Sequence, residues 1–252
     1  MIAWREKARA FAVHFLVTLL FTASAAALVF LIWFPDPFQQ MLGGTQLFEV
    51  LVICDLGLGP LASFIIYSSK KSRRALLFDY SVVGCIQLAA FFYGLYVVAN
   101  TRPVYIAFAV DQLEVVTAGE IDDADLAKAQ GAYRQRPLWG PQLVGIQRAE
   151  DSAERSKMLF SALAGKDYPL LPAYYVPYEQ NLPQVRQRAL PVSDLEKRHP
   201  EAAPLISKAA AQLQIPVEKL TWLRVKHRKG FWTALLDPDT GRPVRWLPVD
   251  PD

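Results

Sequence analysis

Cysteine is scarce in this sequence, with only two among 252 residues. Cys54 and Cys85 both lie inside apolar runs of the first hundred residues, so the rest of the chain has no cysteine for a disulfide. A domain formed by that remainder must be stable without a disulfide, even in an oxidising compartment. Cysteine usage therefore leaves the compartment open.

A strong charge of one sign is also missing. The formal net charge of +3 is too small to indicate binding to a polyanion. We therefore expect no nucleic-acid partner, and the distribution of the charges is more informative than their sum.

The sequence further lacks the usual motifs of cofactor and metal sites. It contains no glycine-rich phosphate loop, and neither His199 nor His227 has cysteine partners at the spacing of a metal site. We expect no catalytic residue, no cofactor and no metal ion.

Apolar residues make up 52% of the chain, and most of the excess lies before Asn100. Three runs, at about 10–34, 46–67 and 75–99, are long enough to cross a hydrocarbon core of about 30 Å as helices. The predicted organisation is a three-helix transmembrane domain over residues 1–100 and a separate domain over residues 101–252.

Basic residues predict the orientation of these spans. Three of them precede the first span, four fill the loop between the second and third, and the loop from Pro35 to Thr45 has none. The seven residues are Arg5, Lys7, Arg9, Lys70, Lys71, Arg73 and Arg74. By the positive-inside rule, the N-terminus is cytoplasmic and the domain after Asn100 lies outside the cytoplasm.

A cleaved signal peptide is the alternative for the first run. Its basic start, apolar core and the small residues Ala23-Ser24-Ala25 match that pattern. The apolar run continues to Phe34, however, and a signal peptide does not need that length. Cleavage would leave two spans and keep the following domain on the same side.

Polar and small residues form a stripe along each span at helical spacing. The main members are His14 in the first span, Asp55, Gly59 and Ala62 in the second, and Asp79, Gln87 and Gly94 in the third. Small residues allow close helix packing, and polar residues in hydrocarbon need partners. Each stripe is therefore expected to face protein rather than lipid.

Two interpretations of the stripes remain open. The stripes of the three helices pack on one another, or part of this surface receives a fourth helix from another protein. The second interpretation assigns a helix-binding groove to Asp55, Gly59, Pro60, Gln87 and Gly94, with a kink at the proline that frees a carbonyl near Leu56.

A polar pair is a further expectation within the spans. His14 and Asp79 lie at similar depth, each about four residues (roughly 6 Å) inside the cytoplasmic boundary. A neutral histidine that donates to a carboxylate lessens the burial cost of both groups, so we expect them to pair.

The second half of the chain reads as an α+β domain. Strands are predicted at 104–110, 113–117, 143–147, 222–228, 231–236 and 244–247, and helices at 120–130, 152–164 and 201–214. The last three strands are joined by short turn-rich segments, which predicts a C-terminal antiparallel β-meander.

Two features of this domain have a structural and a functional interpretation. The segment 168–191 is rich in proline and tyrosine, and it either wraps its own domain or docks a partner through its rings. Arg224, Lys226 and Arg228 alternate along one predicted strand, either as a solvated face or as a surface for an acidic patch on a partner protein.

Several landmarks occur together in a particular order and spacing. They are His14, Trp33-Phe34-Pro35, Gly43-Gly44, Asp55-Leu56-Gly57-Leu58-Gly59-Pro60-Leu61, Phe78-Asp79, Gln87-Leu88-Ala89-Ala90, Tyr93-Gly94 and Arg102-Pro103-Val104 leading towards Asp111. In these landmarks the chain resembles the type IV pilin accessory proteins (TfpX/TfpZ-like) from Met1 to Val116.

The resemblance implies a non-enzymatic, chaperone-like accessory protein of the bacterial inner membrane. It implies binding to the major type IV pilin subunit, contacts with the lipid bilayer and with other pilus assembly proteins, and a periplasmic C-terminal domain. Pilin subunits wait in that membrane on one apolar helix with a buried glutamate, which a polar groove of small residues would suit.

Two other classes compete with this interpretation. An intramembrane aspartyl protease would need Asp55 and Asp79 close together, but their predicted depths differ by roughly 10 Å and the glycines follow Asp55 rather than precede it. A small transporter subunit is the third class, and three spans without an internal repeat suit it poorly.

Overall fold

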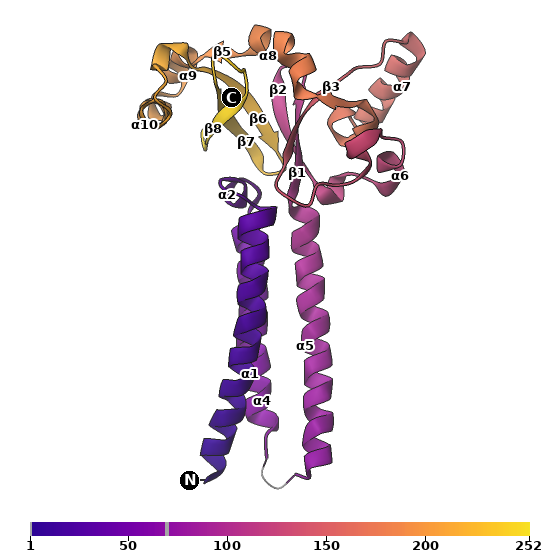
Figure 1. Cartoon of the computed structure of the whole chain (residues 1–252), viewed down its shortest axis with the longest axis vertical. Helices are drawn as coiled ribbons and strands as arrows, with labels where there is room; N and C mark the ends of the chain where they lie inside the picture. Colours follow the sequence, from indigo (N-terminus) through magenta and orange to yellow (C-terminus); the bar gives the residue numbers. More distant parts are fainter. Residues whose placement is uncertain (1, 69–70) are drawn as a thin grey trace. The chain divides into compact units, whose positions relative to one another are not determined.

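The computed structural model describes residues 2–68 and 71–252, so Lys70 of the basic loop lies outside the described residues (Figure 1). The chain divides into two units, Met1–Arg102 and Pro103–Asp252. In the described residues, the regular structure of the first unit is helical, and the β-sheet belongs to the second unit.

Seven helical segments form the first unit. They are α1 Ile2–Ala27, η1 Leu28–Trp33, α2 Phe38–Leu42, α3 Gly44–Val52, η2 Ile53–Leu58, α4 Gly59–Ile66 and α5 Arg73–Thr101. All of them except α2 combine into three continuous helices that are long and apolar enough to cross a membrane, Trp4–Trp33, Gly44–Ile66 and Arg73–Thr101. The three predicted apolar helices are confirmed. The short helix α2, in the expected loop, was not predicted.

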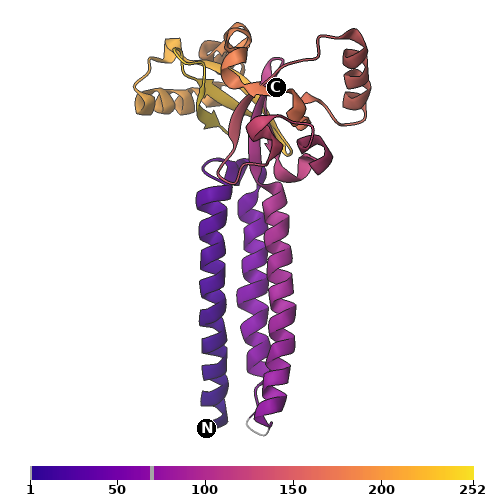
Figure 2. The same cartoon turned by 45° about the vertical axis from the view of Figure 1, so that its right-hand side comes forward.

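The helix formed by α3, η2 and α4 is the middle of the bundle, because α1 and α5 both pack against it (Figure 2). Two of the described segments, η1 and η2, are π-helices, in which carbonyl groups bond five residues ahead instead of four. π-Helical segments are rare in proteins, and those that occur are often found at functional sites. The second of them contains Asp55.

The second unit is built on one mixed sheet in the order β4-β3-β1-β2-β6-β7-β8, with β5 paired to β6. The strands are β1 Pro103–Ala109, β2 Gln112–Thr117, β3 Gln142–Ile146, β4 Tyr175–Pro177, β5 Leu190–Pro191, β6 Thr221–His227, β7 Gly230–Leu236 and β8 Pro243–Leu247. The β1–β2 hairpin and the antiparallel meander of β6, β7 and β8 are confirmed. Strands β1 and β3 are parallel neighbours.

Short helices cover this sheet. They are η3 Ala118–Glu120, α6 Asp123–Leu126, η4 Gly131–Arg134, α7 Ser152–Leu163, η5 Tyr168–Leu170, η6 Pro172–Tyr174, η7 Tyr178–Asn181, α8 Leu182–Arg188, α9 Val192–Arg198, η8 Pro200–Ala202, α10 Ala203–Leu213 and η9 Val217–Lys219. The predicted helices at 152–164 and 201–214 correspond to α7 and α10.

The predicted helix at 120–130 is wrong. Glu120 instead closes a capping box, because its carboxylate accepts hydrogen bonds from the backbone N–H and the hydroxyl of Thr117 at 2.8 and 2.7 Å. The chain then bends, and only the four residues of α6 remain helical. The hydrogen bond from the Thr117 backbone N–H to the Glu120 carboxylate therefore stabilises a local turn here instead of one long helix.

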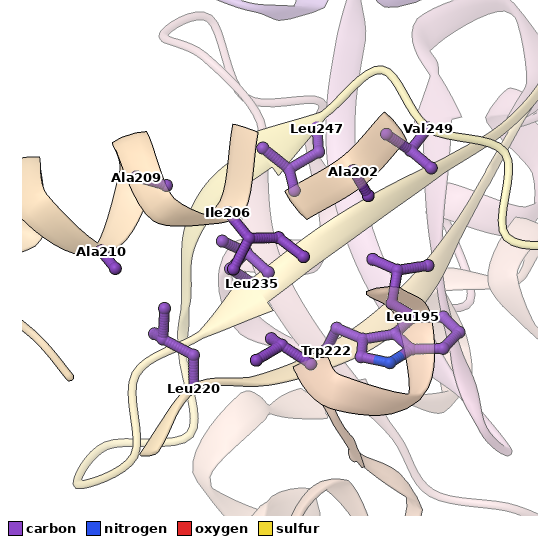
Figure 3. Packing of buried hydrophobic residues seen from close by; sticks show 11 residues of the cluster. Leu195, Ala202, Ile206, Ala209, Ala210, Leu220, Trp222, Leu235, Leu247 and Val249 are labelled. Atoms are coloured by element: carbon purple, nitrogen blue, oxygen red, sulfur yellow. The ribbon is translucent and has the colours of Figure 1, made fainter. Parts of the chain in front are cut away.

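One hydrophobic core lies between α9, α10 and the meander (Figure 3). Ile206 of α10, Leu235 of β7 and Leu247 of β8 point toward one another, and Leu195 of α9 lies against Trp222. A second core lies on β1, β2 and β3 and includes Tyr105, Val116 and Val144. These two cores explain how the unit is stable without a disulfide.

Candidate functional site

The outer surface of the three long helices is apolar. Leu16, Ile65 and Ile86 expose 63%, 75% and 66% of their surface. Exposed apolar surface of this extent is unfavourable in water and favourable in lipid. The three helices therefore indicate a membrane-associated protein.

A polar network joins the three helices beneath this apolar surface. Nε2 of His14 on α1 lies 2.8 Å from Oε1 of Gln87 on α5, and Nδ1 of His14 contacts the hydroxyl of Ser63 on α4. The Gln87 amide also donates to the backbone carbonyl of Asp55 at 3.2 Å and to the Thr18 hydroxyl at 3.4 Å. Gln87 and His14 thus each connect all three helices.

The carbonyl of Asp55 is available because of its place in the π-helix η2. In a π-helix this carbonyl would accept from the N–H five residues ahead, and that residue is Pro60, which has no N–H. Gln87 supplies the missing donor. The expected carbonyl freed by the proline is therefore found one residue earlier than Leu56, because the local geometry is π rather than α.

A cavity of about 250 Å³ lies beside this network. Its polar lining comes from His14 and Thr18 of α1, Asp55 of η2, and Gly84 and Gln87 of α5. Asp55 is only 4% exposed, and no side chain of the described residues hydrogen-bonds its carboxyl group. A buried carboxyl group without a partner is unfavourable, so this cavity is suited to a ligand that brings a polar group.

A second cavity, of about 620 Å³, adjoins the first along α1, because both are lined by His14 and Val17. Its polar lining includes Glu6 and Tyr67, whose hydroxyl donates to the Glu6 carboxylate at 3.1 Å. Together the two cavities form a lateral groove next to α1, which we call the α1 groove. Its lining on α1 extends from Glu6 to Phe21, about four helical turns, so the groove is a candidate site for another helix rather than for a small molecule.

The structure divides the five residues predicted to form a helix-binding groove. Asp55 and Gln87 line the cavity. A Cβ atom at Gly59 would overlap the Gln87 amide, and one at Gly94 would lie 3.1 Å from Cδ1 of Leu51. Both glycines therefore serve packing within the bundle, and Pro60 is buried. These three residues do not line the α1 groove, and their predicted role in binding a helix stays a prediction.

Sequence reasoning missed Gly84 as a groove residue. A Cβ atom there would have no neighbour within 4 Å, and the glycine lines the cavity of about 250 Å³. Its position three residues before Gln87 places both on one helical face, and that spacing could have identified it. His14 also lines the groove, whereas the sequence analysis expected it in a polar pair with Asp79.

The predicted pair of His14 and Asp79 is not formed. Both ring nitrogens of His14 contact Ser63 and Gln87. Lys71 donates to the Asp79 carboxylate at 2.6 Å. Similar depth was the basis of the prediction, but a charged lysine close in sequence supplies the better partner for the carboxylate. Asp79 also does not line the cavity that contains Asp55.

The basic row on β6 is neutralised within its own unit. Lys226 lies 3.0 Å from Glu114, Arg228 lies 3.8 Å from Glu120, and Arg224 pairs with Asp252. Burial raises the pKa of Glu114 above its usual value, although the hydrogen bond from Lys226 acts against this. The row is therefore better described as one side of three ion pairs than as a surface for an acidic partner.

The proline- and tyrosine-rich segment mostly packs on its own unit. The hydroxyl of Tyr178 donates to the carbonyl of Gly241 at 2.9 Å, and the hydroxyl of Tyr175 donates to the carbonyl of Pro169. The rings of Tyr168 and Tyr174 pack edge to face with centroids 4.9 Å apart. The rings are thus used for internal contacts. Among the described residues, no group of three or more His, Cys, Asp or Glu side chains is placed to hold a metal ion.

Three long apolar helices followed by an α+β domain, with an open polar groove beside the first helix, define a membrane-associated protein. The family of fimbrial assembly protein FimB matches residues 2–43 of the chain. No solved structure matches this chain.

Relatives in Dichelobacter nodosus extend the match over most of the chain. The fimbrial assembly proteins of serogroup I and serogroup E1 are 30% and 29% identical over 227 residues, which is 89% of this chain and 88% of each relative. The fimbrial assembly protein of serogroups C1 and C2 is 36% identical over 109 residues, 43% of this chain and 83% of its own. The chain belongs to the family of fimbrial assembly proteins, which confirms the resemblance inferred from its motifs.

Proposed function

We propose that this protein is a non-enzymatic accessory factor that binds the apolar helix of a type IV pilin subunit in the α1 groove and supports pilus assembly or pilin stability. The observation that carries this proposal is the Asp55 carboxyl group, which is buried beside the cavity and has no hydrogen-bond partner among the described residues. A fourth helix with a polar side chain would satisfy it, and would cover the apolar walls formed by Phe21 and Phe91.

The geometry favours a helix over a catalytic reaction at this site. An aspartyl protease needs two carboxyl groups that share a proton, and the second candidate, Asp79, is bonded to Lys71. A pilin helix would instead use the groove through shape and hydrogen bonding, with Gly84 giving room for close approach.

Site-directed crosslinking in intact membranes tests the groove. Cys54 and Cys85 are first replaced by alanine, and a single cysteine is introduced as Leu88→Cys, which lines the cavity, or as Ile86→Cys, which does not. Both positions are exposed and lie at similar depth on α5. With a cysteine in the apolar helix of the pilin, Leu88→Cys is expected to crosslink and Ile86→Cys is not. Equal crosslinking from both positions, or none from Leu88→Cys, would overturn the proposal.

We further propose that the protein resides in the bacterial inner membrane with a cytoplasmic N-terminus and a periplasmic second unit. Arg5, Lys7 and Arg9 lie near the start of the first long helix. Lys71 precedes the third long helix, and Arg73 and Arg74 are its first residues. A reporter enzyme that is active only outside the cytoplasm is expected to work when fused after Asp252 and to be silent when inserted at Ser72. Activity at Ser72 would contradict this topology.

A further inference from the structure

A cleft of about 510 Å³ in the second unit is separate from the residues of the α1 groove. Strands β1 and β3 are parallel, so their carboxyl ends lie next to each other at one end of the sheet. Residues 108–110 at the end of β1, residues 146–148 at the end of β3, and α8 all line the cleft. The volume is that of a ligand site rather than of a packing defect.

The position of α8 depends on a close contact with β3. A Cβ atom at Gly145 would overlap the Asn181 side chain, which directly precedes α8. The Asn181 amide also donates to the carbonyl of Ile146 at 3.3 Å. This contact fixes the separation of β3 and α8, which both line the cleft.

The charge of the cleft is provided by two arginines without partners. Arg148 follows β3 and Arg188 ends α8, and neither has a hydrogen bond or ion pair among the described residues. The unit as a whole has equal numbers of basic and acidic residues, and the basic residues of β6 are paired. Both arginines line the same cleft, where Asp167 is the one acidic side chain of the lining. Arginine without a partner favours carboxylate or phosphate groups.

Amide side chains form most of the remaining polar lining. Gln147, Gln180, Gln184 and Gln187 line the cleft, and their side chains are exposed and have no hydrogen bond within the described chain. Each amide both donates and accepts, which matches the alternating N–H and C=O groups of a polypeptide main chain. A small inorganic anion would make no use of four such groups.

The rim of the cleft carries a strained apolar residue. Val110, in the turn between β1 and β2, has a φ of +63°, a conformation that β-branched residues rarely adopt, and it is half exposed. Glycine or asparagine would fit this turn better, and such strain concentrates at binding sites. With Phe108 and Val176, the Val110 side chain gives the cleft an apolar part.

We propose that this cleft binds an extended, acidic polypeptide segment. Carboxylates of the segment would pair with Arg148 and Arg188, the glutamine amides would hydrogen-bond its main chain, and apolar side chains would contact Val110 and Val176. The ligand is thus a peptide with glutamate or aspartate at alternating positions rather than a free anion.

Fluorescence anisotropy with the full-length protein in detergent tests this assignment. The probe is a labelled, capped heptapeptide of alternating alanine and glutamate, and the reference is the same peptide with glutamine in place of glutamate. Saturable binding is expected for the acidic peptide alone, and Arg148→Gln with Arg188→Gln is expected to weaken it at least about tenfold. The matched control, Arg155→Gln with Lys157→Gln on α7, removes two exposed charges that do not line the cleft and is expected to leave binding unchanged.

Three outcomes would overturn the proposal. Equal losses in the two double variants would show a nonspecific charge effect, and equal binding of the glutamine peptide would remove the role of the arginines. Displacement of the probe by inorganic phosphate at the same concentration as the peptide would show a simple anion site. Because both double variants change exposed residues only, their thermal unfolding is expected to match that of the parent protein.

Discussion

Gly84→Leu is expected to lower the number of surface fimbriae by about tenfold or more, because bulk in a helix-packing surface blocks close approach in lipid. The new side chain would extend from α5 into the cavity of about 250 Å³ that Asp55 and Gln87 line. A Cβ atom at this position meets no atom within 4 Å, so the bundle itself has room for the substitution. Fimbriae would be counted by electron microscopy in cells that contain normal amounts of the variant protein.

Gly57→Leu is the matched control for this experiment. A Cβ atom at Gly57 also has no neighbour within 4 Å, but the residue lies in η2 and does not line the groove. It is expected to leave fimbriation near the parental level. Gly59→Leu and Gly94→Leu are poorer tests, since both glycines pack against neighbouring helices of the same chain. Full fimbriation of the Gly84→Leu strain would move the pilin site away from the α1 groove.

Gln87→Leu is expected to lower the thermal stability of the detergent-purified protein by several degrees. The substitution removes the partner of His14 Nε2 and leaves the carbonyl of Asp55 without a donor, because Pro60 cannot supply one. Buried polar groups left without partners cost roughly 1–3 kcal/mol, and single polar contacts between membrane helices contribute less, about 0.6 kcal/mol on average. We expect the free energy of unfolding to fall by roughly 1 kcal/mol, the lower end of the range for unpaired buried polar groups.

Ser81→Ala is the control for the same helix. The Ser81 hydroxyl donates to the carbonyl of Leu77 at 2.7 Å within α5, so its removal affects no contact between helices. Its unfolding temperature, measured by circular dichroism or a thiol-reactive dye, is expected to stay within about one degree of the parent value. A shift for Gln87→Leu no larger than that of Ser81→Ala would show that the network does not stabilise the bundle.

Residue chemistry predicted the groove only in part. Helical spacing correctly grouped Asp55 with its neighbours on η2 and α4, and Gln87 with its neighbours on α5, as polar stripes. Spacing alone gives the direction of a side chain around its own helix, but not which other helix lies in that direction. Gly59 and Gly94 were therefore assigned to the groove and Gly84 was not, although the first two face helices of the bundle and the last faces open space.

The second unit shows the same limit. Strands with alternating or continuous apolar residues, such as β1 and β6–β8, were predicted well because their burial is encoded locally. Strand β4 and the cleft beside α8 were not predicted. A three-residue strand has too short a pattern to be recognised in a sequence, and the cleft is formed by several segments that are distant in the chain. The ion pairs of Arg224, Lys226 and Arg228 depend on residues far away in the sequence.

The sequence by itself determined the three apolar helices, the α+β class of the second unit and the family, because length, hydropathy and ordered motifs are properties of contiguous residues. The tertiary structure alone decided that His14 contacts Gln87 and Ser63 rather than Asp79, and that Gln87 supplies the donor that Pro60 lacks. It also decided where the groove and the cleft are open. Partners of polar groups are chosen by distance and direction in three dimensions, and segments remote in the chain provide them.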